Sequence, residues 1–149
     1  MSRIEKILVP VDFSASSAYA LEYAIDLAKG MGARIHLLHA YSLPTQIVGP
    51  YEVAPIPNDF FEQVRQSASK HLAQSREKVR AAGIECEASL TDGAPADAIA
   101  ETAQEVGADL IVMGTRGHTG LKHVLLGSVA ERTVRIAPCP VLTTRKKGD

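Results

Sequence analysis

The residues best suited to chemistry are four glycines that fall within 14 positions, Gly114, Gly117, Gly120 and Gly127. The whole chain has 11 glycines, so this stretch is unusually rich in them. Because glycine has no Cβ, its backbone N–H groups can approach an anion closely. The pattern favours an anion-binding loop, although turn glycines in a flexible loop would give the same spacing.

The four residues that follow this loop, Ser128-Val129-Ala130-Glu131, match a capping box. In this interpretation Ser128 accepts a hydrogen bond from the amide three residues on, and Glu131 reaches back to the cap. A helix that begins at Gly127-Ser128 would present unpaired N–H groups and the positive end of its dipole, which favour a phosphate. The negative charge of Glu131 opposes a phosphate unless its carboxylate faces the cap or a cation.

Several other kinds of chemistry are disfavoured. The sequence has no G-x-x-x-x-G-K-[ST], no G-x-G-x-x-G, no G-x-S-x-G, no H-E-x-x-H and no C-x-x-C. Lys and Arg number 16 against 17 Asp and Glu, so the net charge of −1 does not favour nucleic acid or an anionic membrane as a partner. No apolar run approaches the ~20 residues of a membrane span. We expect a cytoplasmic protein.

The elements that must position the glycine loop follow from an alternation of apolar runs with helical periods. Strands are predicted at 7–11, 35–41, 84–90, 109–113 and 141–144. Helices are predicted at 14–30, 59–82, 95–107 and 128–136. The proline-rich segment 42–58 is predicted to be a loop: a lid, a partner surface or a mobile connection. The run 84–90 alternates apolar and polar residues, which is typical of an edge strand.

This order, βαβαβαβαβ in 149 residues, predicts one domain over 1–149. Right-handed crossovers give an open, mostly parallel sheet with helices on both faces. Ligands of such sheets bind beyond the carboxyl ends of the strands, where the strand order reverses. Asp12, Ala40 and Gly114 stand at three of these ends.

The spacing of Gly114, two residues, Gly117, nine residues, Gly127 and Ser128 resembles the ATP-binding signature of the universal stress protein family. It follows the apolar run 110–113 and precedes Pro140-Val141-Leu142, as in that family. The opening segment 7–12 is similar to the family's first strand. The resemblance extends over essentially the whole chain.

The resemblance implies a doubly wound, Rossmann-like fold with strand order 3-2-1-4-5 and a bound ATP, with Mg²⁺. It places these residues around the nucleotide: Pro10, Val11, Asp12, Ala40, Met113, Gly114, Arg116, Gly117, Gly127, Ser128 and Val129. Asp12 would lie near the ribose and Ala40 against the adenine, while Gly117 and residues 127–129 would bind phosphates. Arg116 would reach a phosphate or a second subunit, or remain a solvated loop charge. Phe13 stands where the family commonly has a small residue, and would crowd or cover the site.

The function that these features favour is a regulatory ATP-binding protein that acts as a homodimer joined through the C-terminal strand and contacts a further, unknown protein. Two alternatives are a slow ATPase or phosphotransferase, and a scaffold that binds no nucleotide. The implied strand order puts Cys86 and Cys139 at opposite edges, roughly 19 Å apart at ~4.8 Å per strand. A disulfide needs Cα atoms within about 7 Å, so both thiols should be free.

Overall fold

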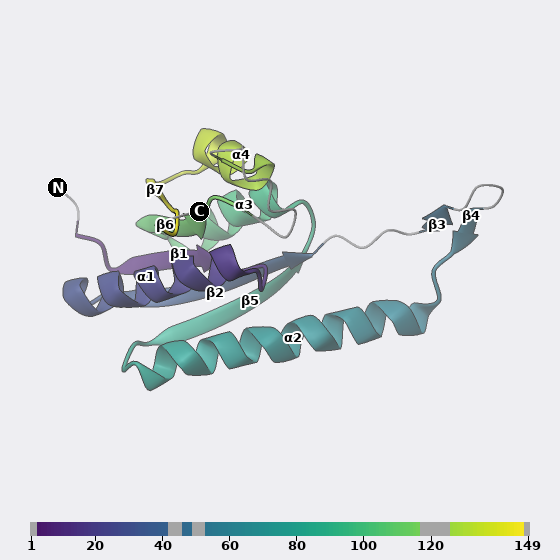
Figure 1. Ribbon diagram of the computed structural model, residues 1–149, viewed down its shortest axis with the longest axis horizontal. Coiled ribbons are helices and arrows are strands. Elements are labelled where there is room, and N and C mark those ends of the chain that lie inside the picture. Colours follow the sequence, from purple (N-terminus) through teal and green to yellow (C-terminus); the bar gives the residue numbers. More distant parts are fainter. Residues whose placement is uncertain (1–2, 42–45, 49–52, 117–125, 148–149) are drawn as a thin grey trace.

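The computed structural model describes residues 3–41, 46–48, 53–116 and 126–147. Their largest unit is a parallel sheet of β1 (Lys6–Pro10), β2 (Arg34–Tyr41), β5 (Cys86–Asp92), β6 (Leu110–Gly114) and β7 (Val141–Thr144). The strand order β5-β2-β1-β6-β7 places the third, second, first, fourth and fifth strands of this sheet side by side (Figure 1). The predicted doubly wound order 3-2-1-4-5 is therefore confirmed.

The central strand β1 is buried on both faces. Ile7, Leu8 and Val9 have no solvent exposure, which explains why their run is continuously apolar. Ile7 and Val9 belong to a core cluster with α1 (Ala15–Met31) and α2 (Asn58–Ala81). Leu8 belongs to a second cluster with α3 (Pro95–Val106) and α4 (Ser128–Ile136). Two helices thus cover each face of the sheet.

Local signals in the sequence set most helix ends. Ser14 caps α1 by accepting a hydrogen bond from the Ser17 amide at 3.1 Å, and Gly32 ends it with φ 67°. Pro95 opens α3, where its missing N–H costs nothing, and Gly107 ends that helix with φ 66°. The predicted bounds of the helices and of the five strands agree with the structure within two residues.

The segment 42–58 departs from prediction. Within it, β3 (Gln46–Val48) and β4 (Val53–Pro55) pair as a small antiparallel sheet, so the expectation of an entirely irregular loop is wrong. Pro55 is compatible with this pairing because a two-stranded sheet has only edge strands, where a missing donor can face solvent. In Figure 1 this pair lies beyond the N-terminal end of α2, away from the main sheet.

The two cysteines are free and belong to opposite edges of the main sheet. Cys86 opens β5 and is buried, whereas Cys139 lies two residues before β7. Burial raises the pKa of the Cys86 thiol to about 11 and also raises that of Cys139. Within the described ranges, no helix combines the length and apolar character needed to cross a bilayer.

Candidate functional site

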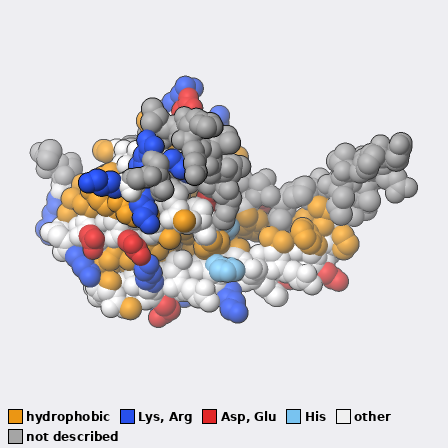
Figure 2. All heavy atoms as spheres, viewed as in Figure 1, with side chains coloured by type: hydrophobic (Ala, Val, Ile, Leu, Met, Phe, Trp, Pro, Cys, Tyr) orange, Lys and Arg blue, Asp and Glu red, His pale blue; other side chains and the backbone are white. Residues whose placement is uncertain are grey.

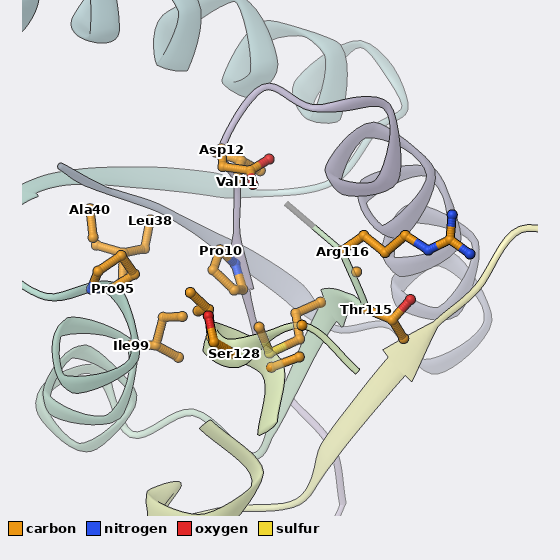
Figure 3. Close-up of a pocket in the computed structure, with 15 residues that line it drawn as sticks. Pro10, Val11, Asp12, Leu38, Ala40, Pro95, Ile99, Thr115, Arg116 and Ser128 are labelled. Atoms are coloured by element: carbon orange, nitrogen blue, oxygen red, sulfur yellow. The ribbon is translucent and has the colours of Figure 1, made fainter. Parts of the chain in front are cut away.

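A cavity of about 310 Å³ lies at the carboxyl ends of β1, β2 and β6, bounded by α3 and the start of α4 (Figure 3). Its position is the one where doubly wound sheets bind ligands, because the chain leaves neighbouring strands there in opposite directions. The residues that line it are Pro10, Val11, Asp12, Leu38, Ala40, Pro95, Ile99, Met113, Gly114, Thr115, Arg116, Gly127, Ser128, Val129 and Ala130.

The sequence-predicted site residues converge on this cavity. Ten of the eleven line it, although they come from three strands, one helix and the residues next to them, which are distant in the chain. The eleventh, Gly117, lies outside the described residues. The glycine spacing and the strand ends therefore lead to the same place in the fold.

One wall of the cavity is apolar and was missed by the sequence reasoning. Leu38 precedes Ala40 by two positions on β2, and Pro95 and Ile99 come from the first turns of α3. The period of two along a strand, which places Leu38 on the same face as Ala40, is the signal that would have found Leu38. Pro95 and Ile99 come after β5 in the chain. They could not be predicted to lie near Ala40, because their position depends on how α3 packs across the sheet.

Asp12 is held at the end of β1 by the start of α1. Its Oδ1 accepts a hydrogen bond from the Ser14 amide at 2.9 Å, and its own N–H donates to Ser17 Oγ at 3.1 Å. These two hydrogen bonds hold the Asp12 carboxylate at the mouth of the cavity. Its orientation therefore does not depend on a bound ligand. A carboxylate oxygen placed this way can accept hydrogen bonds from hydroxyl groups.

The start of α4 differs from the predicted capping box. Gly127 is the cap residue, Ser128 is the first helical residue, and no side-chain hydrogen bond caps this end among the described residues. The physical reason is a long-range bond: the Gly127 N–H donates to the Thr115 carbonyl at 2.5 Å and fixes where the helix begins. The Glu131 carboxylate pairs with Arg135 at 2.8 Å, so it faces a cation rather than the cap.

Among the described residues, no side chain caps this helix terminus, which borders the cavity. Residues in the first turn of a helix have N–H groups with no partner inside the helix, and the helix dipole adds positive potential there. Ser128 and Val129 are exposed and line the cavity, so this end of α4 can receive an anion.

Two of the signature glycines are required by the protein's own packing. A Cβ on Gly114 would lie 2.4 Å from Ser16 Oγ and 3.0 Å from the Ser16 carbonyl oxygen, so α1 could not approach β6. A Cβ on Gly127 would lie 3.0 Å from the Thr115 carbonyl oxygen. Each glycine therefore brings two backbone segments together at the rim of the cavity.

Two side chains next to the cavity point elsewhere. Figure 3 shows the Arg116 side chain extending toward α1, away from Ala40, Pro95 and Ser128. Phe13 is not among the described residues that line the cavity, so the expectation that it would cover the site is wrong. Its left-handed backbone, φ 64°, turns its ring to the opposite face of the sheet, where it packs against His39 at 4.5 Å and His71 at 5.1 Å.

The fold and this cavity define a doubly wound α/β protein with a ligand cleft at its topological switch point. The model of the universal stress protein family matches residues 3–145, and the chain belongs to this family.

Known proteins resemble the chain over nearly its full length. Universal stress protein MJ0531 of Methanocaldococcus jannaschii is 36% identical over 95% of this chain and 82% of its own. Universal stress protein YxiE of Bacillus subtilis is 35% identical over 94% of this chain and 98% of its own. A universal stress protein solved in complex with cAMP has a TM-score of 0.72 and 28% identity, over 97% and 98% of the two chains. One from Archaeoglobus fulgidus in complex with dAMP has a TM-score of 0.67 and 25% identity, over 97% and 100%.

Proposed function

We propose that this chain binds an adenine nucleotide, ATP with Mg²⁺, in the cavity at the ends of β1, β2 and β6, and acts as a homodimeric regulatory switch. The observation that carries the proposal is the composition of this one cavity. It combines an apolar wall, an oriented carboxylate and an open helix N-terminus within about 310 Å³. That volume lies at the lower end of the range of small-molecule pockets, ~300–1,000 Å³.

The apolar wall suits a nucleobase. Ala40 and Pro95, which are partly exposed and backed by the buried Leu38 and Ile99, offer apolar surface against which a flat ring can be buried away from water. Asp12 lies at the adjoining strand end, where its carboxylate can accept a hydrogen bond from a ribose hydroxyl. The base and the sugar therefore have complementary surfaces on neighbouring strands.

The start of α4 suits the phosphates. Backbone N–H groups at Ser128 and Val129 and the Ser128 hydroxyl can donate to phosphate oxygens, and the dipole of α4 favours the negative charge. Among the described residues, no group of three acidic, histidine or cysteine side chains could hold a metal. Mg²⁺ would accordingly be bound mainly through the phosphates and its own waters, as it commonly is in nucleotide complexes.

The relatives support an adenine nucleotide as the class of ligand. Two of the solved structures are complexes with cAMP and dAMP. Both ligands contain adenine, a ribose-type sugar and a single phosphate. The choice of ATP rests on the glycine spacing of residues 114–128, which resembles the family's ATP-binding signature. Titrations with ligands of one and three phosphates distinguish a preference for ATP from a preference for a nucleoside monophosphate.

The lining favours binding over rapid turnover. Among the described residues around the cavity, Asp12 is the one carboxylate, and the set contains no histidine or lysine. Asp12 is itself engaged by the Ser14 amide, and Arg116 points away. Fast phosphoryl transfer relies on groups that stabilise charge on the transferred phosphate and orient the attacking group. A nucleotide-free scaffold is the alternative outcome of the titration below, whereas a slow ATPase would be revealed by release of phosphate from ATP.

The open edge of β7 supports the homodimer. β7 pairs with β6 along one side. Its other side is an edge of the described sheet, where no further strand pairs with it. Three apolar side chains of the adjacent α4 are exposed, Val129, Val134 and Ile136, at 37%, 50% and 40%. An open strand beside exposed apolar residues is a suitable surface for a second copy related by a two-fold axis.

The experiment is a calorimetric titration of nucleotide-stripped protein with Mg-ATP, AMP and cAMP. Ala40→Leu adds bulk to the apolar wall and should weaken all three ligands by about tenfold, equivalent to ~1.4 kcal/mol. Thr91→Leu is the matched control, because Thr91 pairs with Ala40 across β2 and β5 but is not among the described lining residues. Absence of binding of all three ligands to the wild-type protein would instead support the scaffold.

A further inference from the structure

A second cavity, of about 390 Å³, lies on the α1 side of residues Thr115 and Arg116. Its walls come from the first turns of α1, the end of β6 and the residues after β7, and they include Tyr19, Arg116, Arg145 and Lys146. Figure 2 shows Lys and Arg side chains gathered above α1, on the side where the chain ends. No function described above uses this cavity.

Packed backbone separates this cavity from the proposed nucleotide site. Thr115 and Arg116 line both cavities, so the two share a wall. The wall is tight because Gly114 lies against Ser16, and the Arg116 N–H donates to Ser16 Oγ at 3.4 Å. A ligand on the α1 side would therefore occupy a space of its own.

The charge of the second cavity is strongly positive. Arg116, Arg145 and Lys146 contribute three cations, and Glu22 is the one acidic residue among its described lining. The Glu22 carboxylate pairs with Lys78 of α2 at 3.1 Å, so its charge is largely balanced from outside the cavity. Cations brought together from two segments that are distant in the chain repel one another unless an anion lies between them.

Arg116 gives an independent reason to expect an anion. Its Nη2 atom is buried and has no hydrogen-bond partner among the described residues. An unsatisfied buried donor on a charged group is costly, and planar guanidinium groups pair well with phosphate and carboxylate oxygens. The direction of Arg116 in Figure 3, toward α1, places its guanidinium on the side of this second cavity.

We propose that the cavity between α1, Arg116 and Lys146 is a second anion site, which binds a phosphate group independently of the nucleotide. Arg116 and Lys146 supply the charge, and the hydroxyl of the half-buried Tyr19 supplies a further donor. The phosphate belongs either to free inorganic phosphate or to a small phosphorylated molecule, since both present the same oxygens. Thr115 and Arg116 form the wall that this site shares with the proposed nucleotide pocket.

The test is a titration of the full chain with inorganic phosphate, and then with glycerol 3-phosphate, followed by two-dimensional amide NMR. Saturable shifts are expected at residues 15–19 and 145–146. Lys146→Gln should weaken phosphate binding by about fivefold, the loss expected for one exposed charge-assisted contact. Lys147→Gln is the matched control, because it removes the same charge one residue further on, from a side chain outside the described lining. It should change the affinity by less than about twofold.

The two ligands distinguish the two sources of phosphate, since tighter binding of glycerol 3-phosphate would indicate a phosphorylated metabolite. Equal losses in Lys146→Gln and Lys147→Gln, or no saturable shifts in the wild-type protein, would overturn the proposal. A Lys146→Gln variant that loses affinity for Mg-ATP but keeps it for AMP would assign the cavity to the nucleotide's own phosphates and also overturn it. Because inorganic phosphate is the probe, these results stand apart from the test of ATP binding.

Discussion

At the scale of single residues, Gly114 shows how a signature position can be required by packing as well as by a ligand. A side chain there would collide with Ser16 at the start of α1, the turn that also orients Asp12 through Ser14 and Ser17. The glycine therefore determines how closely α1 approaches β6, and through α1 it determines the position of Asp12 at the cavity.

Gly114→Ala should lower the free energy of unfolding by about 1–3 kcal/mol, the usual cost of overpacking. Gly30→Ala is the control, because a Cβ at this helical position meets nothing within 4 Å. The control should raise the stability by about 0.5–1 kcal/mol, since alanine loses less conformational freedom than glycine in a helix. Urea unfolding measures both, and a Gly114→Ala protein as stable as the wild type would show that α1 moves freely relative to β6.

His36 predicts a dependence of stability on pH. Burial lowers its pKa below the ordinary value of 6.5, with Lys6 acting in the same direction and Glu87 opposing them. The unfolded chain then binds a proton more readily than the folded protein does. This contribution to stability is complete above pH 6.5 and is lost as the pH falls through that value toward the folded pKa.

Urea unfolding at about pH 7.5 and about pH 5.5 measures this loss. His36→Gln should lose less stability than the wild type over that interval, because glutamine does not titrate. His71→Gln removes an exposed imidazole from α2 and serves as the control, which should keep the wild-type difference. An identical loss in the wild type and His36→Gln would contradict the role assigned to His36.

The sequence predicted which residues surround the cavity better than it predicted what each of them does. Asp12, Ala40 and Ser128 were located because strand ends and glycine spacing are local signals. The directions of Arg116 and Phe13 were not predictable, since they depend on a left-handed turn and on the packing of α1. The capping box at Ser128 was displaced by the hydrogen bond from Gly127 to Thr115, a contact between residues 12 positions apart.

At the scale of elements, apolar runs and helical periods were sufficient to predict the five strands of the main sheet and its four helices, whereas the strand order came from the resemblance to the family. The alternation in 84–90 indicated an edge strand, and β5 is one edge of the main sheet. The pairing of β3 with β4 was not predicted, because the prolines of segment 42–58 argue against regular structure and each of these strands has only three residues. Short strands are specified mainly by their partner.

The edge of β7 supplies the prediction at this scale. The carbonyls of Pro140 and Thr144 accept hydrogen bonds from the Ile111 and Thr115 amides of the β6 side. Because alternate residues of a strand direct their polar groups to opposite sides, the Thr143 N–H points to the open edge. Thr143→Pro thus removes a donor from the proposed dimer contact while it leaves the β6–β7 bonds in place.

Light scattering and sedimentation should show that Thr143→Pro weakens the dimer by about tenfold or more, because a two-fold contact loses this donor from both copies. Thr143→Val retains the N–H group and should dimerise like the wild type. A wild-type protein that is monomeric at about tens of micromolar, or a proline variant that dimerises normally, would exclude β7 as the contact.

At the scale of the whole molecule, the doubly wound topology brings the parts of the site together. β1 and β6 are neighbours in the sheet although about a hundred residues separate them, and the start of α4 is fixed against the end of β6 by Gly127 and Thr115. The proposed nucleotide pocket and the second, basic cavity lie on either side of this junction. The central claim is that the start of α4 binds the phosphates of ATP.

The most direct test is calorimetric titration of Ser128→Asp with Mg-ATP and with adenosine. An acidic residue in the first turn of a helix favours folding, and Ser128 is exposed, so the variant should fold normally. Its charge should lower the affinity for Mg-ATP by about tenfold or more and leave the affinity for adenosine within about twofold. Ser128→Asn introduces a side chain with the shape of aspartate but without its charge. This variant should bind Mg-ATP within about threefold of the wild type. If Ser128→Asp binds Mg-ATP as tightly as the wild type, the phosphates do not lie at the start of α4.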